Sequence, residues 1–303
     1  MKRYEIRTDL SPSEILDLIH FGEQNFSDQL ESLSQALLAQ PNLHFLGLTG
    51  PTCSGKTTAA NLLTKVFEAD GKQVYVVSID DFYYDKRYLL EMSAKKGLTT
   101  LDYDSEDTID VELLRACVES LRDQKETRLP RFNFITGERE RGETVIPSEQ
   151  DIFLFEGIQV LYPSVDRILR GEFYRSIHIA PQSEVETGGE VFAPNEIRLM
   201  RRLVRDYHFR NSLPDFTLTL WQSVRENEER LIFPNVSRCD YSIDSTMPYE
   251  IGILKPFLER ILPSVPKTHE FFSVGETILK ELREVQPFSA DLIPQNSLYK
   301  EFI

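Results

Sequence analysis

Short apolar runs alternate along most of the chain with longer segments in which apolar residues recur at helical spacing. The short runs predict strands at 43–48, 74–79, 151–155, 176–180 and 239–243. The longer segments predict helices at 58–67, 108–121, 195–210, 215–230 and 249–262. Because strands that alternate with helices usually pair in parallel, the pattern predicts an α/β fold, with one parallel sheet and helices on both of its faces.

Other segments do not follow this alternation. Residues 1–40 are polar and mostly helical, and they predict an added helical layer whose function the sequence does not disclose. Residues 82–107 and 181–194 have the composition of loops. The two β-rich stretches 129–135 and 143–146 predict a hairpin.

Composition and charge limit the partners and the cellular compartment that the chain can have. The 303 residues are 41% hydrophobic and 27% charged, which is ordinary for a soluble globular protein. A net charge of −15 argues against a nucleic-acid partner and against an anionic membrane surface. No apolar run approaches the ~20 residues of a spanning helix, and three scattered cysteines predict neither a disulfide framework nor a zinc site. These features predict a cytoplasmic protein.

A glycine-rich motif lies between the first predicted strand and the next helix. Residues 50–58, GPTCSGKTT, fit the pattern G-x-x-x-x-G-K-[ST] of a phosphate-binding loop. Backbone N–H groups of such a loop hold phosphate oxygens, Lys56 reaches the β- and γ-phosphates, and the Thr57 hydroxyl holds Mg²⁺. A glycine-rich turn before a helix is the alternative, but strand, loop and helix follow in the order that the motif requires. The residues expected to bind the nucleotide are Gly50, Thr52, Cys53, Ser54, Gly55, Lys56, Thr57 and Thr58.

Acidic residues end two of the predicted strands. Ligands of parallel sheets bind beyond the carboxyl ends of the strands, so a carboxylate of Asp80 or Asp81 can accept a proton there from an attacking hydroxyl. Successive side chains alternate in direction, so only one of the two is expected to face the site. Turn hydrogen bonds by both carboxylates are the alternative. Glu156 is expected to act on Mg²⁺, directly or through water, with a capping role as its alternative.

Four arginines recur at helical spacing. Arg198, Arg201, Arg202 and Arg205 fall on one face of the predicted helix 195–210. This is the strongest local positive patch in an acidic chain, and it predicts a mobile lid that clamps the transferring phosphates. A solvated face paired with acidic neighbours is the alternative.

Several motifs occur in the order found in a known family. They are Gly50–Thr58, Ser78–Tyr83, Tyr103–Asp107, Pro130–Arg139, Phe155–Gly157 and Arg201–Asp206. Over about residues 41–262 they resemble the uridine kinase and phosphoribulokinase family of P-loop kinases, and they are closer to uridine kinase. The stretch from Arg201 to Pro234 and the closing residues Ile293–Ile303 look like a bacterial uridine-kinase-like branch. Some members of that branch carry an N-terminal domain related to threonyl-tRNA synthetase, for which the chain is too short upstream of the phosphate loop.

The resemblance implies a role for each matching residue. Asp80 matches the general base for a nucleoside 5′-hydroxyl, and Thr57 and Glu156 match the metal shell. The arginine helix matches the lid, with Arg201 and Arg205 as its catalytic arginines. On the substrate side, Tyr83 and Asp104 match residues near the sugar, Phe132 and Phe134 match an aromatic pair around the base, and Arg139 matches a substrate-side arginine.

The chain departs from the family's uridine kinases at one place. Asn133 and Thr136-Gly137 stand where those kinases have an aspartate and Thr-His, and the histidine would have hydrogen-bonded the pyrimidine edge. Stacking without a polar partner discriminates poorly between bases, so we expect an atypical nucleoside preference with low uridine activity.

The sequence therefore predicts a kinase that uses ATP and Mg²⁺, with a P-loop NTPase-type parallel sheet and a nucleoside as its small-molecule substrate. A kinase of another alcohol or sugar phosphate and a non-catalytic nucleotide-binding regulator are the alternatives, and GTP as donor and a homo-oligomer are left open. The expected organisation is a helical N-terminal extension (1–40), a kinase core (41–265) with a substrate-binding insertion (about 83–147) and a lid region (about 181–212), and a C-terminal extension (266–303).

Overall fold

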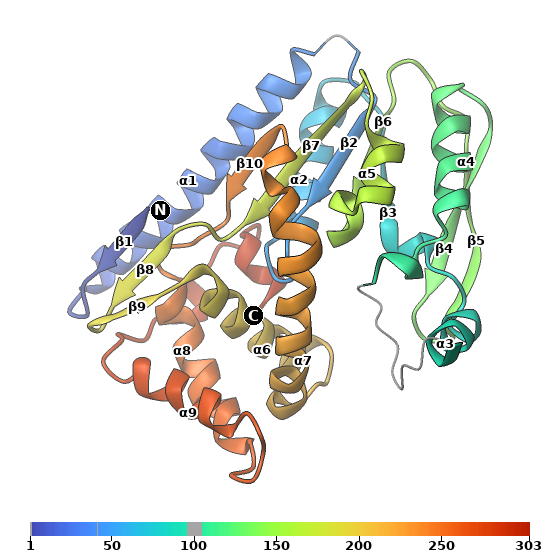
Figure 1. Cartoon of the computed structure of the whole chain (residues 1–303). Helices are drawn as coiled ribbons and strands as arrows, with labels where there is room; N and C mark the ends of the chain where they lie inside the picture. The colour runs from blue at the N-terminus through green and yellow to red at the C-terminus, as the bar shows by residue number, and fades with distance from the viewer. Residues whose placement is uncertain (1, 41, 96–104) are drawn as a thin grey trace.

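A computed structural model describes residues 2–40, 42–95 and 105–303. At its centre lies a five-stranded sheet in the order β10-β7-β2-β6-β3, with every neighbouring pair parallel (Figure 1). The strands are β2 (Phe45–Thr49), β3 (Val74–Ser78), β6 (Ile152–Glu156), β7 (Tyr174–Ala180) and β10 (Tyr241–Asp244). The predicted parallel sheet is thereby confirmed.

Helices cover both faces of this sheet. The helices of the core are α1 (Pro12–Leu38), α2 (Lys56–Ala69), α4 (Val111–Arg122), α5 (Pro163–Leu169), α6 (Pro194–Phe209), α7 (Pro214–Asn227) and α8 (Glu250–Ile261), and α9 (Phe272–Glu281) packs on the turn that follows α8. On β6, Ile152 and Leu154 join a buried cluster with α1, α2, α6 and α8, whereas Phe153 and Phe155 join a second cluster with α4 and α5. Because both faces are buried, the strand is a continuous apolar run rather than an alternating one.

The predicted hairpin is present, but the segment before it is not a loop throughout. Strands β4 (Thr127–Asn133) and β5 (Glu138–Val145) pair antiparallel. Residues 86–95, predicted as loop, form the helix α3 (Lys86–Lys95). This helix buries only Leu89, so it has almost no apolar periodicity. The backbone N–H of Lys86, the first residue of this helix, donates to the Gly137 carbonyl at 2.7 Å. The two residues lie far apart in the sequence, so the local pattern could not predict this contact.

A second, small sheet was not predicted. It joins β1 (Arg3–Ile6), β8 (Glu184–Thr187) and β9 (Glu190–Phe192), so the predicted loop 181–194 is corrected, and the mostly helical segment 1–40 begins with a short strand. These strands are too short for periodicity to be read, and β1 is held by parallel pairing to β8. The Arg3 guanidinium adds ion pairs to Glu184 and Glu186.

The C-terminal end of the chain returns to the middle of the molecule (Figure 1). Leu298, Tyr299 and Phe302 are buried in the same cluster as α2 and α6. Leu298 lies so close to Gly55 that a Cβ at Gly55 would come within 2.2 Å of its Cδ1. No helix in the described part of the chain is both long enough and apolar enough to cross a bilayer.

One histidine of the central sheet is buried without a hydrogen-bond partner. His178 on β7 is 5% exposed, and neither ring nitrogen has a partner among the described residues. Burial lowers the pKa of His178 to about 4, and the positive charges of Lys56 and Arg198 act in the same direction. The ring is therefore held neutral in the folded protein.

This histidine predicts a loss of stability in acid. The unfolded chain, with a histidine pKa of about 6.5, binds the proton more readily than the folded protein. The free energy of unfolding should therefore fall by on the order of 3 kcal/mol for this group as pH drops from 6.5 to 4. Urea unfolding of wild type and His178→Gln at pH 7, 5.5 and 4 measures this, and the variant should depend less on pH. Parallel curves for the two proteins would contradict the prediction.

Candidate active site

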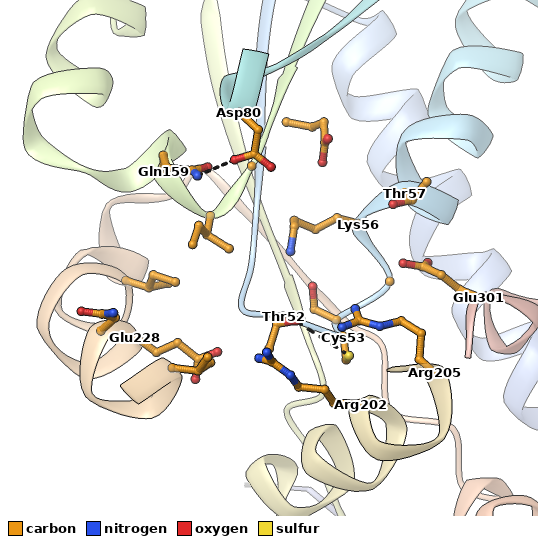
Figure 2. Close-up of a pocket in the computed structure, with 18 of the residues that line it drawn as sticks. Thr52, Cys53, Lys56, Thr57, Asp80, Gln159, Arg202, Arg205, Glu228 and Glu301 are labelled. Atoms are coloured by element: carbon orange, nitrogen blue, oxygen red, sulfur yellow. Dashed lines mark hydrogen bonds between the residues drawn. The ribbon is translucent and has the colours of Figure 1, made fainter. Parts of the chain in front are cut away.

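The carboxyl ends of β2, β3 and β6 border a cavity of about 560 Å³ (Figure 2). The loop after β2 contributes Lys56, the turn after β3 contributes Asp80, and β6 ends in Glu156. Arginines of α6 and the C-terminal Glu301 close the cavity from other sides. The cavity thus lies where ligands of open parallel sheets bind.

The loop between β2 and α2 has the geometry of an anion site. Gly55 has a φ of 90° and immediately precedes the first residue of α2, so the helix N-terminus points into the cavity. The hydroxyl of Ser54 is buried and has no partner within the described residues. An unpaired hydroxyl beside a helix N-terminus fits a phosphate oxygen. Of the residues expected to bind a nucleotide, Thr52, Cys53, Ser54, Gly55, Lys56 and Thr57 line the cavity.

Lys56 lies folded against its own loop. Its ammonium donates to the carbonyls of Gly50 and Pro51, each at 2.9 Å. Burial lowers the pKa of Lys56, and the carboxylates of Glu156 and Glu301 oppose this by raising it. The ammonium is therefore placed at the cavity and partnered only by neutral oxygens among the hydrogen bonds of the described residues.

The two adjacent aspartates have different surroundings. Asp80 lines the cavity, and its Oδ1 accepts a hydrogen bond from Gln159 Nε2 at 2.6 Å. Asp81 points to the hairpin, where its Oδ1 accepts from the backbone N–H of Phe132 at 2.8 Å. Burial raises the pKa of Asp81, and that N–H opposes the shift. Only one carboxylate faces the cavity, as the sequence predicted, and it is Asp80.

Glu156 and Thr57 are the residues whose oxygen atoms could hold a divalent metal at the cavity. Glu156 lines the cavity and accepts from the Ser78 hydroxyl at 3.2 Å; Thr57 is exposed at its edge. Burial raises the pKa of Glu156, and the Lys56 ammonium opposes this. Across the described ranges no group of three or more His, Cys, Asp or Glu could hold a metal. Hard oxygen donors in small number fit Mg²⁺, which takes its other ligands from phosphates and water.

The arginine helix is arranged differently from the prediction. Arg201 is fully buried, and its guanidinium forms a two-point ion pair with Glu250, at 2.7 and 3.0 Å. It also donates to the carbonyls of Cys53 and Ser245. Arg201 does not line the cavity. Its predicted place on the phosphates is therefore corrected, because its charge is used in the core beneath the phosphate loop.

The other arginines of α6 divide between core and cavity. Arg198 is buried and pairs with Glu228 at 2.6 and 2.7 Å. Arg202 and Arg205 line the cavity, and both donate to Asp206. All four arginines are paired with acids, as the alternative held, but they are buried rather than solvated. The helix of the predicted lid is packed between α7 and α8.

Of the predicted substrate residues that the structure describes, Tyr83 alone belongs to the cavity lining. The rings of Phe132 and Phe134 lie edge-to-face beside Tyr83, with centroids 5.5 and 6.4 Å away. Phe132 is buried, whereas Phe134 is 65% exposed. The guanidinium of Arg139 pairs with Asp110 at 2.9 Å and does not reach the cavity lining. Asp104 lies outside the described residues.

The glycine that replaces the family's histidine cannot readily be exchanged. Gly137 has a φ of 74°, and a Cβ there would lie 2.7 Å from the Cβ of Lys86. A side chain at this position would be strained both by the backbone conformation and by the neighbouring side chain. The absence of a histidine is thus built into the turn of the hairpin.

Several residues of the cavity lining were not predicted from the sequence, and Glu301 and Gln159 are the two with the most informative contacts. Glu301 accepts from the Thr58 hydroxyl at 3.0 Å, which turns this expected phosphate-binding residue toward the C-terminal segment. Gln159 donates to both Asp80 and Tyr83. Glu301 lies 243 positions from Thr58, and no local pattern marks such a contact. Gln159, three residues after Glu156, was within reach of the strand-end rule that found Glu156.

Comparisons with known proteins agree with this geometry. The phosphoribulokinase/uridine kinase family matches residues 45–251. The chain belongs to this family. It is 29% identical to uridine-cytidine kinase B of Dictyostelium discoideum over 161 residues, and this match covers 53% of this chain and 57% of that protein. It is 30% identical to the uridine kinase of Clostridium botulinum over 181 residues, and this match covers 59% of this chain and 76% of that protein.

A solved structure supports the fold. A Silicibacter protein named for a fructose transport system kinase superposes with a TM-score of 0.52 at 23% identity, over 70% of this chain and 98% of that one. At this identity the likeness concerns the fold alone.

Proposed function

We propose that this protein is a kinase that transfers the γ-phosphoryl group of ATP, with Mg²⁺, to a hydroxyl of a small substrate. The observation that carries the proposal is the meeting of Lys56, Asp80 and Glu156 in one cavity at the ends of parallel strands. A nucleotide-binding regulator has no need of a carboxylate at Asp80. Relatives named uridine kinase favour a nucleoside 5′-hydroxyl as the acceptor.

Each step of the transfer has a residue for it. Asp80 accepts the proton of the attacking hydroxyl as that oxygen bonds to the γ-phosphorus and the bond to the β-phosphate oxygen breaks. Lys56 exchanges its loop carbonyls for β- and γ-phosphate oxygens, while Arg202 and Arg205 face the charge that develops. Mg²⁺, held by Thr57 and Glu156, would neutralise charge on the same phosphates.

The aromatic residues grouped around Tyr83 determine which acceptor we expect. Tyr83, Phe132 and Phe134 can hold a planar base, and Gly137 brings no side chain to its edge. We therefore expect several nucleosides to be accepted with modest discrimination.

A panel of acceptors tests the function. Purified protein is incubated with ATP or GTP and Mg²⁺ and with each of the common ribonucleosides, and products are identified by mass. Sugar phosphates complete the panel. A nucleoside monophosphate supports the proposal. Nucleotide binding without transfer to any acceptor would favour the regulator, and a doubly phosphorylated sugar would favour the alternative kinase.

Lys56→Ala should lower kcat by at least ~10², because one charged contact with the transferring group is lost. The fold should persist, since the ammonium bonds only its own loop. Lys65→Ala is the matched control: Lys65 lies on the same helix, is exposed, and does not line the cavity. Rates by coupled ADP release, with melting curves for both variants, give the comparison. Near-normal turnover of folded Lys56→Ala would end the kinase proposal.

A further inference from the structure

Gln159 connects two residues of the proposed reaction centre. It lies in the 3₁₀ turn Ile158–Leu161 that follows β6. Its side-chain Nε2 donates to Asp80 Oδ1 at 2.6 Å and to Tyr83 Oη at 2.7 Å. In Figure 2 the Gln159 side chain points at the Asp80 carboxylate. Both protons of one amide nitrogen are therefore used on residues that face the cavity.

The other end of this amide is left without a partner. Gln159 Oε1 is buried, and no donor among the described residues reaches it. An unpaired buried acceptor costs roughly 1–3 kcal/mol. Turning the amide over would bring Oε1 against the Asp80 carboxylate and would lose the hydrogen bond to Oδ1, even though the Tyr83 hydroxyl could donate to the turned Oε1. The negative charge of Asp80 thus fixes the orientation of the amide despite the unpaired oxygen.

The residue before this turn makes room for the amide. Gly157 has a φ of 154°, and a Cβ there would lie 2.5 Å from Gln159 Oε1. A larger residue at Gly157 would push the amide away from Asp80. The short motif after β6 thus combines Glu156, which faces the cavity, with a glycine that allows Gln159 to reach the neighbouring strand end.

We propose that Gln159 is a positioning residue that acts through Asp80. The inference rests on the proposed function, in which Asp80 takes the proton of the attacking hydroxyl. The hydrogen bond to Oδ1 fixes the rotation of the carboxylate, and the second oxygen then meets the hydroxyl at a defined place. A general base must lie about 2.6–3.2 Å from its proton donor, and a misplacement of about 1 Å costs on the order of 10² in rate. The same amide fixes Tyr83, so the base and the acceptor side are aligned together.

The test separates turnover from donor binding. Gln159→Met keeps the length and removes both hydrogen bonds, and Gln159→Asn keeps the amide but shortens it. Each should lower kcat by about 10- to 100-fold while KM for ATP stays within about twofold, because donor binding does not use Asp80. Gln150→Met, in an exposed turn away from the cavity, is the matched control and should behave as wild type.

A double-mutant cycle decides how Gln159 acts. In an Asp80→Asn background there is no base to position, so adding Gln159→Met should change the residual kcat by less than about twofold. Equal losses in both backgrounds, or a matching rise in KM for ATP, would show a structural role and overturn the inference. So would wild-type kcat in a folded Gln159→Met or Gln159→Asn protein. Absence of transfer by the wild type would instead refute the proposed function itself.

Discussion

Asp80→Asn should lower kcat by ~10³ and leave KM for ATP almost unchanged. Asparagine keeps the shape of the side chain, and its oxygen can still accept from Gln159, but it cannot take a proton from the acceptor hydroxyl. Steady-state rates with a saturating acceptor, together with direct measurement of ATP binding, separate the two quantities.

The matched control is the neighbouring carboxylate. Asp81→Asn retains an oxygen for the Phe132 N–H and lies away from the cavity, so its kcat should stay within a few-fold of wild type. If Asp81→Asn were the damaging change and Asp80→Asn harmless, the base would have been assigned to the wrong side of the turn.

Arg201→Ala should destabilise the fold by about 3–5 kcal/mol, because it leaves the carboxylate of Glu250 buried without its counter-charge. Burial raises the pKa of Glu250, and the Arg201 guanidinium opposes this rise. The rings of Tyr299 and Phe302, 5.7 and 5.0 Å from the guanidinium, would lose their cation as well. Urea unfolding at pH 7 measures the loss.

Arg205→Ala gives the contrast on the same helix. Arg205 lines the cavity and pairs with Asp206. Its removal should therefore lower kcat, whereas the free energy of unfolding should fall less than it does in Arg201→Ala. An Arg201→Ala protein that melts like wild type but turns over slowly would return Arg201 to the phosphates and contradict its assignment to the core.

The parts of the site that are built from contiguous residues could be predicted from the sequence. The phosphate loop needs only a strand, a short glycine-rich turn and the start of a helix, all contiguous, and the structure has them in that order. Glu156 and Asp80 followed from the rule for strand ends. Choosing Asp80 over Asp81 needed the family resemblance, because the 3₁₀ turn Ile79–Phe82 replaces the strict alternation of a strand.

Helical spacing correctly predicted that the four arginines share one helix, but it could not predict that their surroundings differ. Periodicity shows which residues share a face; it does not show what covers that face. Here α7, α8 and the C-terminal segment cover α6, so Arg198 and Arg201 face buried carboxylates while Arg202 and Arg205 reach the cavity. The strands β1 and β8 were missed for a related reason: their pairing partners lie far away in the chain.

The contact between the phosphate loop and the C-terminal segment bears on how the protein is made. Gly55 meets Leu298, and Thr58 meets Glu301 across 243 positions. At about 5–20 residues per second, roughly 10–50 s of translation separate the two sides of that contact. Throughout this interval the phosphate loop of the nascent chain lacks its contacts with Leu298 and Glu301, so the cavity is incomplete. The cavity can thus be completed only late in synthesis, when residues 298–302 have left the ribosome and packed against the phosphate loop.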